Sequence, residues 1–216
     1  MTVALAVVGL LLRTQDVVLE PSDDVWVYQF AQDQTDDEYL RVWSGDGEAV
    51  GDVKSGSLTF SYSCLKFDLS KVPATRLTGA KLVMTHAGTA GYTAEDSKKH
   101  PLEARSLTTE WSEANWQYEN FSKVHPQKDP LTIFGTGSAG PNSAAEPFKI
   151  EIDLMAGKSG FAKAFEEALK GSSKSLAMAL TSTLSPEGQG EGFVYRLFSK
   201  TNEETKRPKL VLTFEG

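Results

Sequence analysis

Short segments in which apolar and polar residues alternate recur from about residue 17 to the end of the chain. In the segment YLRVW, Leu40 and Val42 share one side of an extended backbone and Arg41 lies on the other. The segment FKIEIDL, at residues 148–154, alternates in the same way. Because successive side chains of a β-strand point to opposite faces, this two-residue period predicts strands with one buried face.

The strand segments are separated by stretches rich in glycine, proline, serine and aspartate, which are typical of turns. Both faces are apolar in the segment VWVYQF, which indicates a strand covered on both sides. We expect strands within the segments 17–20, 25–30, 39–43, 57–70, 79–88, 102–111, 148–154, 175–183, 192–200 and 207–216. Two long polar loops are expected at 89–101 and 123–146.

One segment has the period of an amphipathic helix. SGFAKAFEEALKG places Phe161 and Phe165 on one stripe and predicts a helix from about Ser159 to Lys170. Ser159 is a suitable N-cap, and Gly171 is a suitable stop. Many short strands with a single late helix predict an all-β protein, an antiparallel β-sandwich of jelly-roll type with one short helix.

The first residues are apolar and do not alternate. The stretch from Val3 to Leu12 is too short to cross a bilayer and has the length of the hydrophobic region of a signal peptide. No positive charge precedes it and no A-x-A site follows it, so a first strand is the alternative interpretation. We expect an atypical or truncated signal peptide over residues 1–15, one domain over 16–216, and a secreted or cell-surface location.

Composition narrows the choice of partners. The chain has 216 residues and a net charge of −7, which argues against nucleic acid as a partner because neutralising phosphates requires a basic face. A chain of this length can bury a large core without cross-links. Its one cysteine, Cys64, lies in an apolar run and is expected to be a buried small hydrophobe. We expect a monomer without a membrane-spanning segment.

No established catalytic motif is present in the sequence. The histidines, His86, His100 and His125, are scattered and lack the close spacing of zinc ligands. Glu110 and Glu113 are three residues apart, so on a strand their carboxylates would point to opposite faces, and nothing selects them as a glycosidase pair. We therefore expect a protein that is not an enzyme, and keep a hydrolase or lyase as the third hypothesis.

Acidic residues gather in several turns. Asp23 and Asp24 follow a Pro-Ser pair, and turns of this kind can supply the oxygen ligands that calcium requires. No EF-hand spacing is present, so solvated acid is the alternative interpretation. Asp23 and Asp24 are our candidate ligands for a structural Ca²⁺, and no other cofactor is expected.

Three sequence motifs occur in a recognisable order. CLKFDLS begins at Cys64, TTEWSEANW runs from Thr108 to Trp116, and RPKLVLTF ends at Phe214. Together with the intervening strands, these motifs resemble the DNRLRE-type β-sandwich domain, also classed as carbohydrate-binding module family ninety-six. The chain departs from that pattern where serines precede LKFDLS in place of arginine, and where Lys200 replaces a usual arginine.

The resemblance implies a secreted, non-catalytic module that binds polysaccharide. In such a domain Trp111 and Trp116 are mainly structural, and Tyr118 is the better candidate for an exposed ring. An aromatic ring can stack on a sugar face, and basic side chains can hold uronate carboxylates.

The strand positions of the basic side chains support the hypothesis of a carbohydrate-binding module for a uronate-rich polysaccharide. Arg41 and Lys66 lie opposite the apolar residues of their strands, and Arg196 and Lys200 share one parity. The candidate binding residues are Arg41, Lys66, Arg105, Tyr118, Arg196 and Lys200. At least three of the five basic residues are expected on one concave surface. The alternative is a structural or adhesive cell-surface module without a sugar ligand, which the acidic net charge favours.

Overall fold

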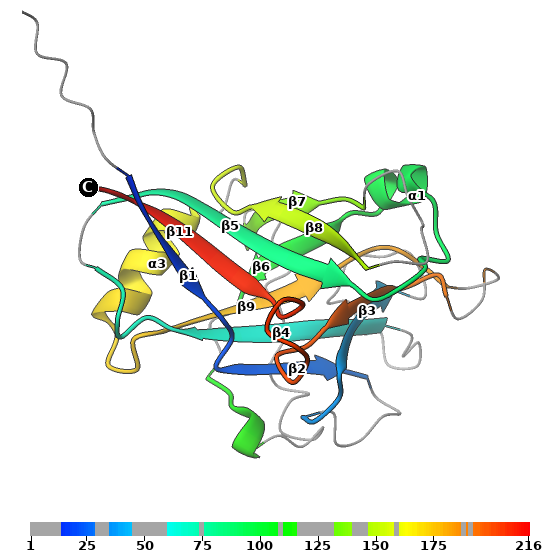
Figure 1. Ribbon diagram of the computed structural model, residues 1–216, viewed down its shortest axis with the longest axis horizontal. Helices are drawn as coiled ribbons and strands as arrows, with labels where there is room; N and C mark the ends of the chain where they lie inside the picture. Colours follow the sequence, from blue (N-terminus) through cyan, green and yellow to red (C-terminus); the bar gives the residue numbers. More distant parts are fainter. Residues whose placement is uncertain are drawn as a thin grey trace, which may run out of the picture.

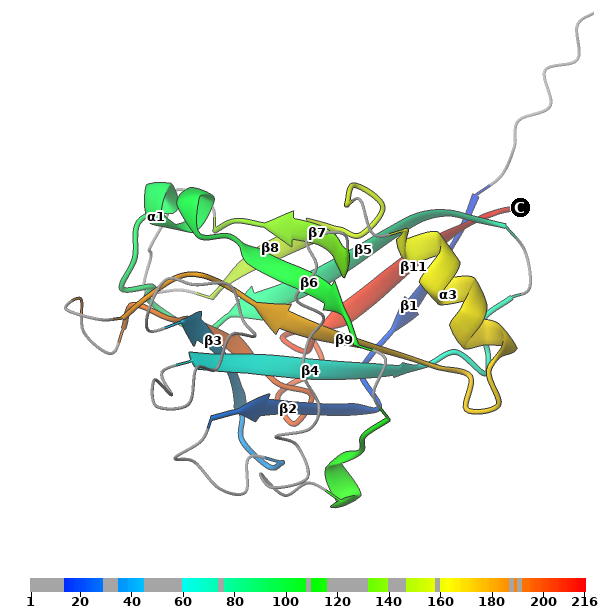
Figure 2. The ribbon, with the colours of Figure 1, turned by 180° about the vertical axis from the view of Figure 1, so that it is seen from behind.

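Two layers of antiparallel β-strands form the protein in the computed structural model. The structure describes residues 14–28, 35–44, 60–73, 76–107, 110–115, 132–139, 147–157, 160–186, 189 and 192–216. The first layer, nearest the viewer in Figure 1, contains β1 (Thr14–Leu19), β3 (Tyr39–Ser44), β5 (Leu77–His86), β8 (Phe148–Asp153), β10 (Tyr195–Phe198) and β11 (Lys209–Glu215). The second layer, nearest the viewer in Figure 2, contains β2 (Asp23–Val27), β4 (Phe60–Asp68), β6 (Leu102–Ser106), β7 (Ile133–Gly137) and β9 (Ser175–Thr181).

The strand order confirms the predicted sandwich. The main path runs β1-β11-β5-β10-β3-β4-β9-β6-β7, with β2 paired to β4 and β8 paired to β5. The two layers join where Trp43 of β3 pairs with Ser61 of β4. From β3 to β6, and again from β7 to β10, consecutive strands alternate between the layers, which is the connection pattern of a jelly roll.

The main core lies between the two layers. The strands turn their apolar sides inward, as their alternation predicts, and Leu65, Phe67, Ile150 and Ile152 are fully buried. Burying one such side chain contributes about 1.5–3 kcal/mol, so this interior is the dominant favourable contribution to stability.

A smaller apolar cluster covers the outer side of β2 and β4. Its members are Val25, Val27, Tyr62, Cys64, Leu107 and Trp111. The strand β2 is therefore buried on both faces, as its all-apolar pattern predicts. Trp111 is 8 % exposed, which confirms that this ring is part of the fold. Trp116 lies outside the described residues.

The predicted helix is α3 (Phe161–Lys170), which closes one end of the sandwich (Figure 1). Its two phenylalanines are buried, and the Phe161 ring packs edge-on against Phe134 at 5.1 Å between centroids. Gly160 stands at the N-cap with a φ of 72°, a left-handed conformation that favours glycine. The proposed N-cap, Ser159, lies outside the described residues.

The expectation of a single helix is wrong. A second helix, α1 (Ala94–Lys99), lies at the opposite end of the sandwich within the expected loop 89–101. Thr93 and Asp96 form a capping box, in which each side chain accepts a hydrogen bond from the other residue's backbone N–H. The helix is short and polar, so it has no apolar stripe from which to predict it.

Two further boundaries differ from the sequence-based expectations. The strand β7 occupies part of the expected loop 123–146, and Thr14 and Gln15, expected in the signal peptide, belong to β1. The rest of the expected signal peptide, residues 1–13, lies outside the described residues. Among the helices that the structure describes, none has both the length and the apolar character needed to cross a membrane.

Candidate functional site

Two of the predicted binding residues are neighbours on the outer side of the first layer. Arg41 of β3 and Arg196 of β10 are register partners in an antiparallel pair. Both point away from the core because their strand neighbours, Leu40 and Leu197, are buried. Cross-strand partners on one face lie about 5 Å apart at Cβ, so the two guanidinium groups share one patch of surface.

Aromatic rings surround this pair of arginines. The Arg41 guanidinium carbon lies 4.5 Å from the centre of the Trp26 ring, and that of Arg196 lies 4.7 Å from the centre of the Tyr39 ring. Tyr28 connects to Trp26 by a stacked contact of 6.3 Å between centroids. We call the set formed by Tyr28, Tyr39, Arg41, Trp43 and Arg196 the aromatic–arginine surface.

The members of this surface are open to solvent to different degrees. Arg196 is exposed, and the other four residues are half-buried. The Trp43 ring meets the Tyr28 ring edge-on at 5.4 Å, so the rings support one another instead of standing alone. Rings that are held in place lose little conformational freedom when a ligand stacks on them.

Asp37 organises the centre of the surface. Its Oδ2 accepts hydrogen bonds from Trp26 Nε1 at 2.9 Å and from an Arg41 Nη at 2.8 Å. Its other carboxylate oxygen accepts from the Tyr39 backbone N–H at 3.0 Å. The backbone oxygen of Asp37 accepts from Ser199 Oγ at 2.6 Å, which ties the turn to the end of β10. Arg41 is therefore partly neutralised and fixed in position.

Lys200 belongs to a different cluster. Its ammonium pairs with Glu113 at 2.9 Å, and its backbone N–H donates to Asp24 Oδ2 at 2.7 Å. Asp24 in turn donates its own N–H to Glu113 Oε1 at 2.6 Å, and the Glu113 N–H donates to Asp23 Oδ1 at 3.2 Å. These contacts attach the turn after Trp111 to β2 and to the turn after β10.

Burial raises the pKa of the Asp24 carboxyl to about 7, against the lowering effect of the Lys200 backbone hydrogen bond. Asp23 and Asp24, the candidate calcium ligands, are thus both engaged in contacts with the protein. Within the described ranges, no group of three or more His, Cys, Asp or Glu side chains is arranged to hold a metal ion.

Lys66 and Arg105 also have partners within the fold. The Lys66 ammonium donates to the Trp111 carbonyl and lies 5.0 Å from the centre of the Trp111 ring. Arg105 is 3 % exposed, and its guanidinium donates to Glu103 at 2.7 Å and to Thr181 at 2.9 Å. A buried guanidinium cannot reach a polysaccharide. Contrary to the prediction, Arg105 therefore does not belong to the binding surface. Tyr118 lies outside the described residues.

The three histidines were not predicted to form a zinc site. His86 ends β5 and is buried, with its ring stacked on Phe148 at 4.7 Å. Its Nε2 accepts a hydrogen bond from the Arg196 N–H at 3.2 Å, and burial lowers its pKa to about 4. His100 makes a 2.9 Å contact from Nδ1 to Thr183, and His125 lies outside the described residues.

Arg41 and Arg196 are the two members of the aromatic–arginine surface that were predicted as binding residues, and the other three were not predicted. Tyr39 and Trp43 share the strand parity of Arg41, so the segment YLRVW carried this signal. The position of Tyr28 in the sequence carried no such signal, because Tyr28 reaches the surface only through the contact between β2 and β3.

Comparison with known proteins adds no family assignment: no family model matches this chain, and no curated protein matches it significantly. The resemblance to the DNRLRE-type domain therefore stays a prediction carried by three local motifs.

Proposed function

We propose that this protein is a non-catalytic carbohydrate-binding module that binds a uronate-containing polysaccharide through the aromatic–arginine surface. The supporting observation is the position of Arg41 and Arg196 as register partners, each stacked on an aromatic ring. This arrangement offers the two kinds of group that an acidic polysaccharide needs, a flat apolar ring and a fork of N–H donors.

Arg196 is the residue that we expect to hold a uronate carboxylate. It is exposed, and no ion pair engages it within the part of the chain that the structure describes. A guanidinium presents parallel N–H donors that match a carboxylate, and each charge-assisted hydrogen bond contributes about 1.5–3 kcal/mol. Arg41 supports binding less directly, because Asp37 already occupies part of its hydrogen-bonding capacity.

Trp43 and Tyr39 supply the apolar component. Their rings lie on the same face of β3 as Arg41, one on each side of it along the strand. Alternate residues of a strand are about 6.6–6.8 Å apart, so the three side chains form a row that can follow an extended chain of sugars.

A structural or adhesive module is the second candidate, and a specific observation favours it. Lys66, Arg105 and Lys200 all have partners within the fold. Of the five predicted basic residues, only Arg41 and Arg196 therefore lie together in the part of the chain that the structure describes. A basic surface of two residues binds an anionic polymer more weakly than one of three or more, because counterion release increases with the number of contacts.

Affinity electrophoresis in gels containing alginate, a polyuronate, or a neutral glucan separates the two candidates. We expect alginate to retard the wild-type protein, and added salt to reduce the retardation because exposed charges are screened. Arg196→Ala and Trp43→Ala should each lose most of the retardation.

Arg76→Ala is the matched control. Arg76 is an exposed arginine paired with Glu215 at 2.9 Å, so its loss changes the net charge equally but touches no residue of the aromatic–arginine surface. No retardation of the wild type by either polysaccharide, or equal loss in Arg76→Ala and Arg196→Ala, would favour the structural module.

A further inference from the structure

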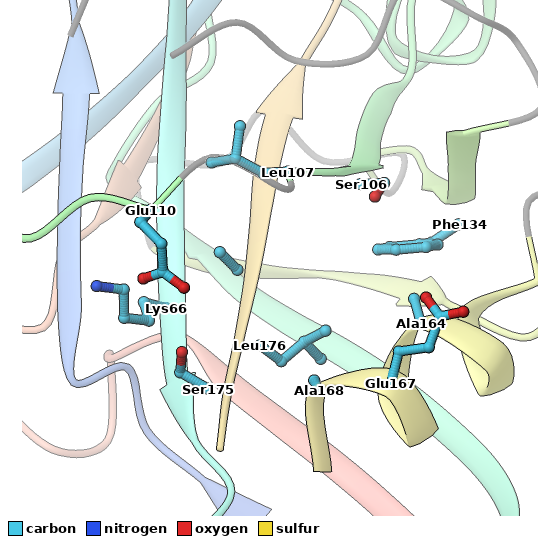
Figure 3. A pocket seen from close by; sticks show the side chains of 11 residues that line it. Lys66, Ser106, Leu107, Glu110, Phe134, Ala164, Glu167, Ala168, Ser175 and Leu176 are labelled. Carbon is cyan, nitrogen blue, oxygen red and sulfur yellow. The ribbon is translucent and has the colours of Figure 1, made fainter. Parts of the chain in front are cut away.

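The charged groups around the cavity beside α3 do not converge on one ligand. This cavity, of about 220 Å³, lies between α3 and the second layer (Figure 3). Glu110 and Glu167 lie at its opposite ends, and Lys66 lies beside Glu110. The aromatic–arginine surface shares no residue with this cavity, and its charged groups lie close together. The arrangement of those charges therefore indicates more about a ligand than the cavity does.

Three positions along β3 differ in charge. At the first, the exposed Arg196 lies over the Tyr39 ring, with its guanidinium carbon 4.7 Å from the ring centre. At the second, Arg41 is paired with Asp37, and at the third Trp43 presents an aromatic ring. Alternate residues of a strand are about 6.6–6.8 Å apart, so the row from Tyr39 to Trp43 is about 13 Å long. A row of this length contacts more than one sugar of a bound chain.

Asp37 neutralises the second position and is held there by more than Arg41. Its Oδ2 lies 2.8 Å from an Arg41 Nη, and the Arg41 and Asp37 side chains are 33 % and 25 % exposed. The same carboxylate accepts hydrogen bonds from Trp26 Nε1 and from the Tyr39 backbone N–H, which fix it independently of Arg41. Arg41, Asp37 and Arg196 together carry a charge of +1, so a single carboxylate neutralises this surface.

A polysaccharide with a carboxylate on every sugar does not match this charge pattern. One uronate carboxylate at Arg196 neutralises the available charge. A second carboxylate, on the neighbouring sugar, would approach Arg41 and lie beside the partly exposed carboxylate of Asp37. Like charges placed side by side disfavour a partner, and specificity often depends on such a repulsive contact. The net charge of −7 on the whole chain also opposes a densely charged polyanion.

We propose that the aromatic–arginine surface selects uronate-containing polysaccharides in which uncharged sugars separate the carboxylates, and that Asp37 determines this selectivity. This inference rests on the proposed function. One uronate carboxylate binds Arg196, and an uncharged sugar lies over the pair of Arg41 and Asp37. There the remaining N–H groups of Arg41 donate to the hydroxyl groups of that sugar. Trp43 stacks on the next sugar.

Affinity electrophoresis with two forms of alginate tests this proposal. One form is unesterified, and in the other every second carboxylate, on average, is esterified with propylene glycol, so the backbone is the same and the carboxylate density is halved. Retardation at several polymer concentrations gives a dissociation constant for each form. The selectivity is the dissociation constant for unesterified alginate divided by that for the half-esterified form. We expect a wild-type selectivity of at least about three, the equivalent of a single exposed charge pair.

Three variants assign the selectivity to Asp37. Asp37→Asn removes the charge and keeps an oxygen acceptor, so the selectivity should fall to about one or below. Arg41→Gln leaves the Asp37 carboxylate without its cation and should raise the selectivity at least about threefold above the wild-type value. Asp36→Asn is the matched control, because this exposed neighbour undergoes the same change of net charge, and it should keep the wild-type selectivity. Urea denaturation shows whether each variant is folded, and Arg41→Gln carries the test if Asp37→Asn is not.

The inference is overturned if the wild type binds unesterified alginate as tightly as the half-esterified form, or if Asp36→Asn lowers the selectivity as much as Asp37→Asn. An unchanged selectivity in both Asp37→Asn and Arg41→Gln also overturns it. In each of these outcomes alginate still retards the wild type, so the proposed function stands. Absence of retardation by either form overturns the proposed function, and this inference with it.

Discussion

The buried carboxyl of Asp24 should make the stability of the protein depend on pH in a defined way. Asp24 is 2 % exposed and its pKa is raised from 3.8 to about 7, chiefly because burial disfavours the charged form. Between these two values the folded protein binds a proton at Asp24 that the unfolded chain has lost. The stability that this proton provides is full below pH 3.8 and is lost as the pH rises through about 7.

The magnitude follows from the size of the shift. Each pKa unit corresponds to about 1.4 kcal/mol, so a shift of about three units is worth at most about 4 kcal/mol. Asp24→Asn removes the titration and keeps an oxygen that can accept the Lys200 N–H. Relative to the variant, the wild type should therefore lose about 4 kcal/mol of unfolding free energy between pH 4 and pH 8.

Urea denaturation followed by tryptophan fluorescence at several pH values measures this difference. Comparing the two proteins at each pH cancels the titration of groups that they share. Asp23→Asn is the matched control, because Asp23 is the adjacent aspartate in the sequence and is more exposed than Asp24. A difference between wild type and Asp24→Asn that stays constant from pH 4 to pH 8 would refute the reasoning, since it would mean that Lys200 and the backbone N–H fully offset burial.

Three further predictions concern stability and use the same denaturation assay. Trp111→Ala should lower the unfolding free energy by about 3–5 kcal/mol, and a variant that stays as stable as wild type but fails to bind polysaccharide would show that the ring is a binding platform. Burial lowers the pKa of His86 to about 4. The unfolding free energy of the wild type should therefore fall by up to about 3 kcal/mol relative to that of His86→Phe as the pH falls from 6.5 to 4. Equal pH dependence of the two proteins would contradict this. Gly157→Ala should destabilise by more than about 2 kcal/mol because its Cβ would overlap the backbone oxygen of Phe134. Gly79→Ala, whose Cβ would have its nearest neighbour at 3.4 Å, should cost less than about 1 kcal/mol. Similar costs for the two variants would contradict this prediction.

The outcome for the basic residues shows why the site was harder to predict than the fold. Parity along a strand correctly placed Arg41 on the outer face, and Arg196 of β10 lies on that same face. It could not show that the two are register partners, because pairing joins β3 to a strand more than 150 residues away in sequence. Arg105 was also predicted as a binding residue, yet its guanidinium is buried against Glu103 and Thr181.

The helix α1 illustrates a second limit. Apolar periodicity identifies elements that bury a stripe of side chains, and α3 has such a stripe. The six residues of α1 are polar, and this helix is stabilised by its capping box and by its position at the end of the sandwich. The Thr-x-x-Asp spacing was the available signal, but four residues of this kind also occur in ordinary turns.

The sequence by itself determined the all-β class, most of the strands, the core positions and the outward direction of Arg41, because each depends on local alternation along one strand. Tertiary structure decided which outward residues meet. In the folded protein Arg41 lies beside Arg196 and next to Trp26, and Asp37 accepts a hydrogen bond from Arg41. Lys66 and Lys200 hold the segment around Trp111. These outcomes depend on strand pairing and layer contacts, which join residues distant in sequence and leave no periodic trace in it.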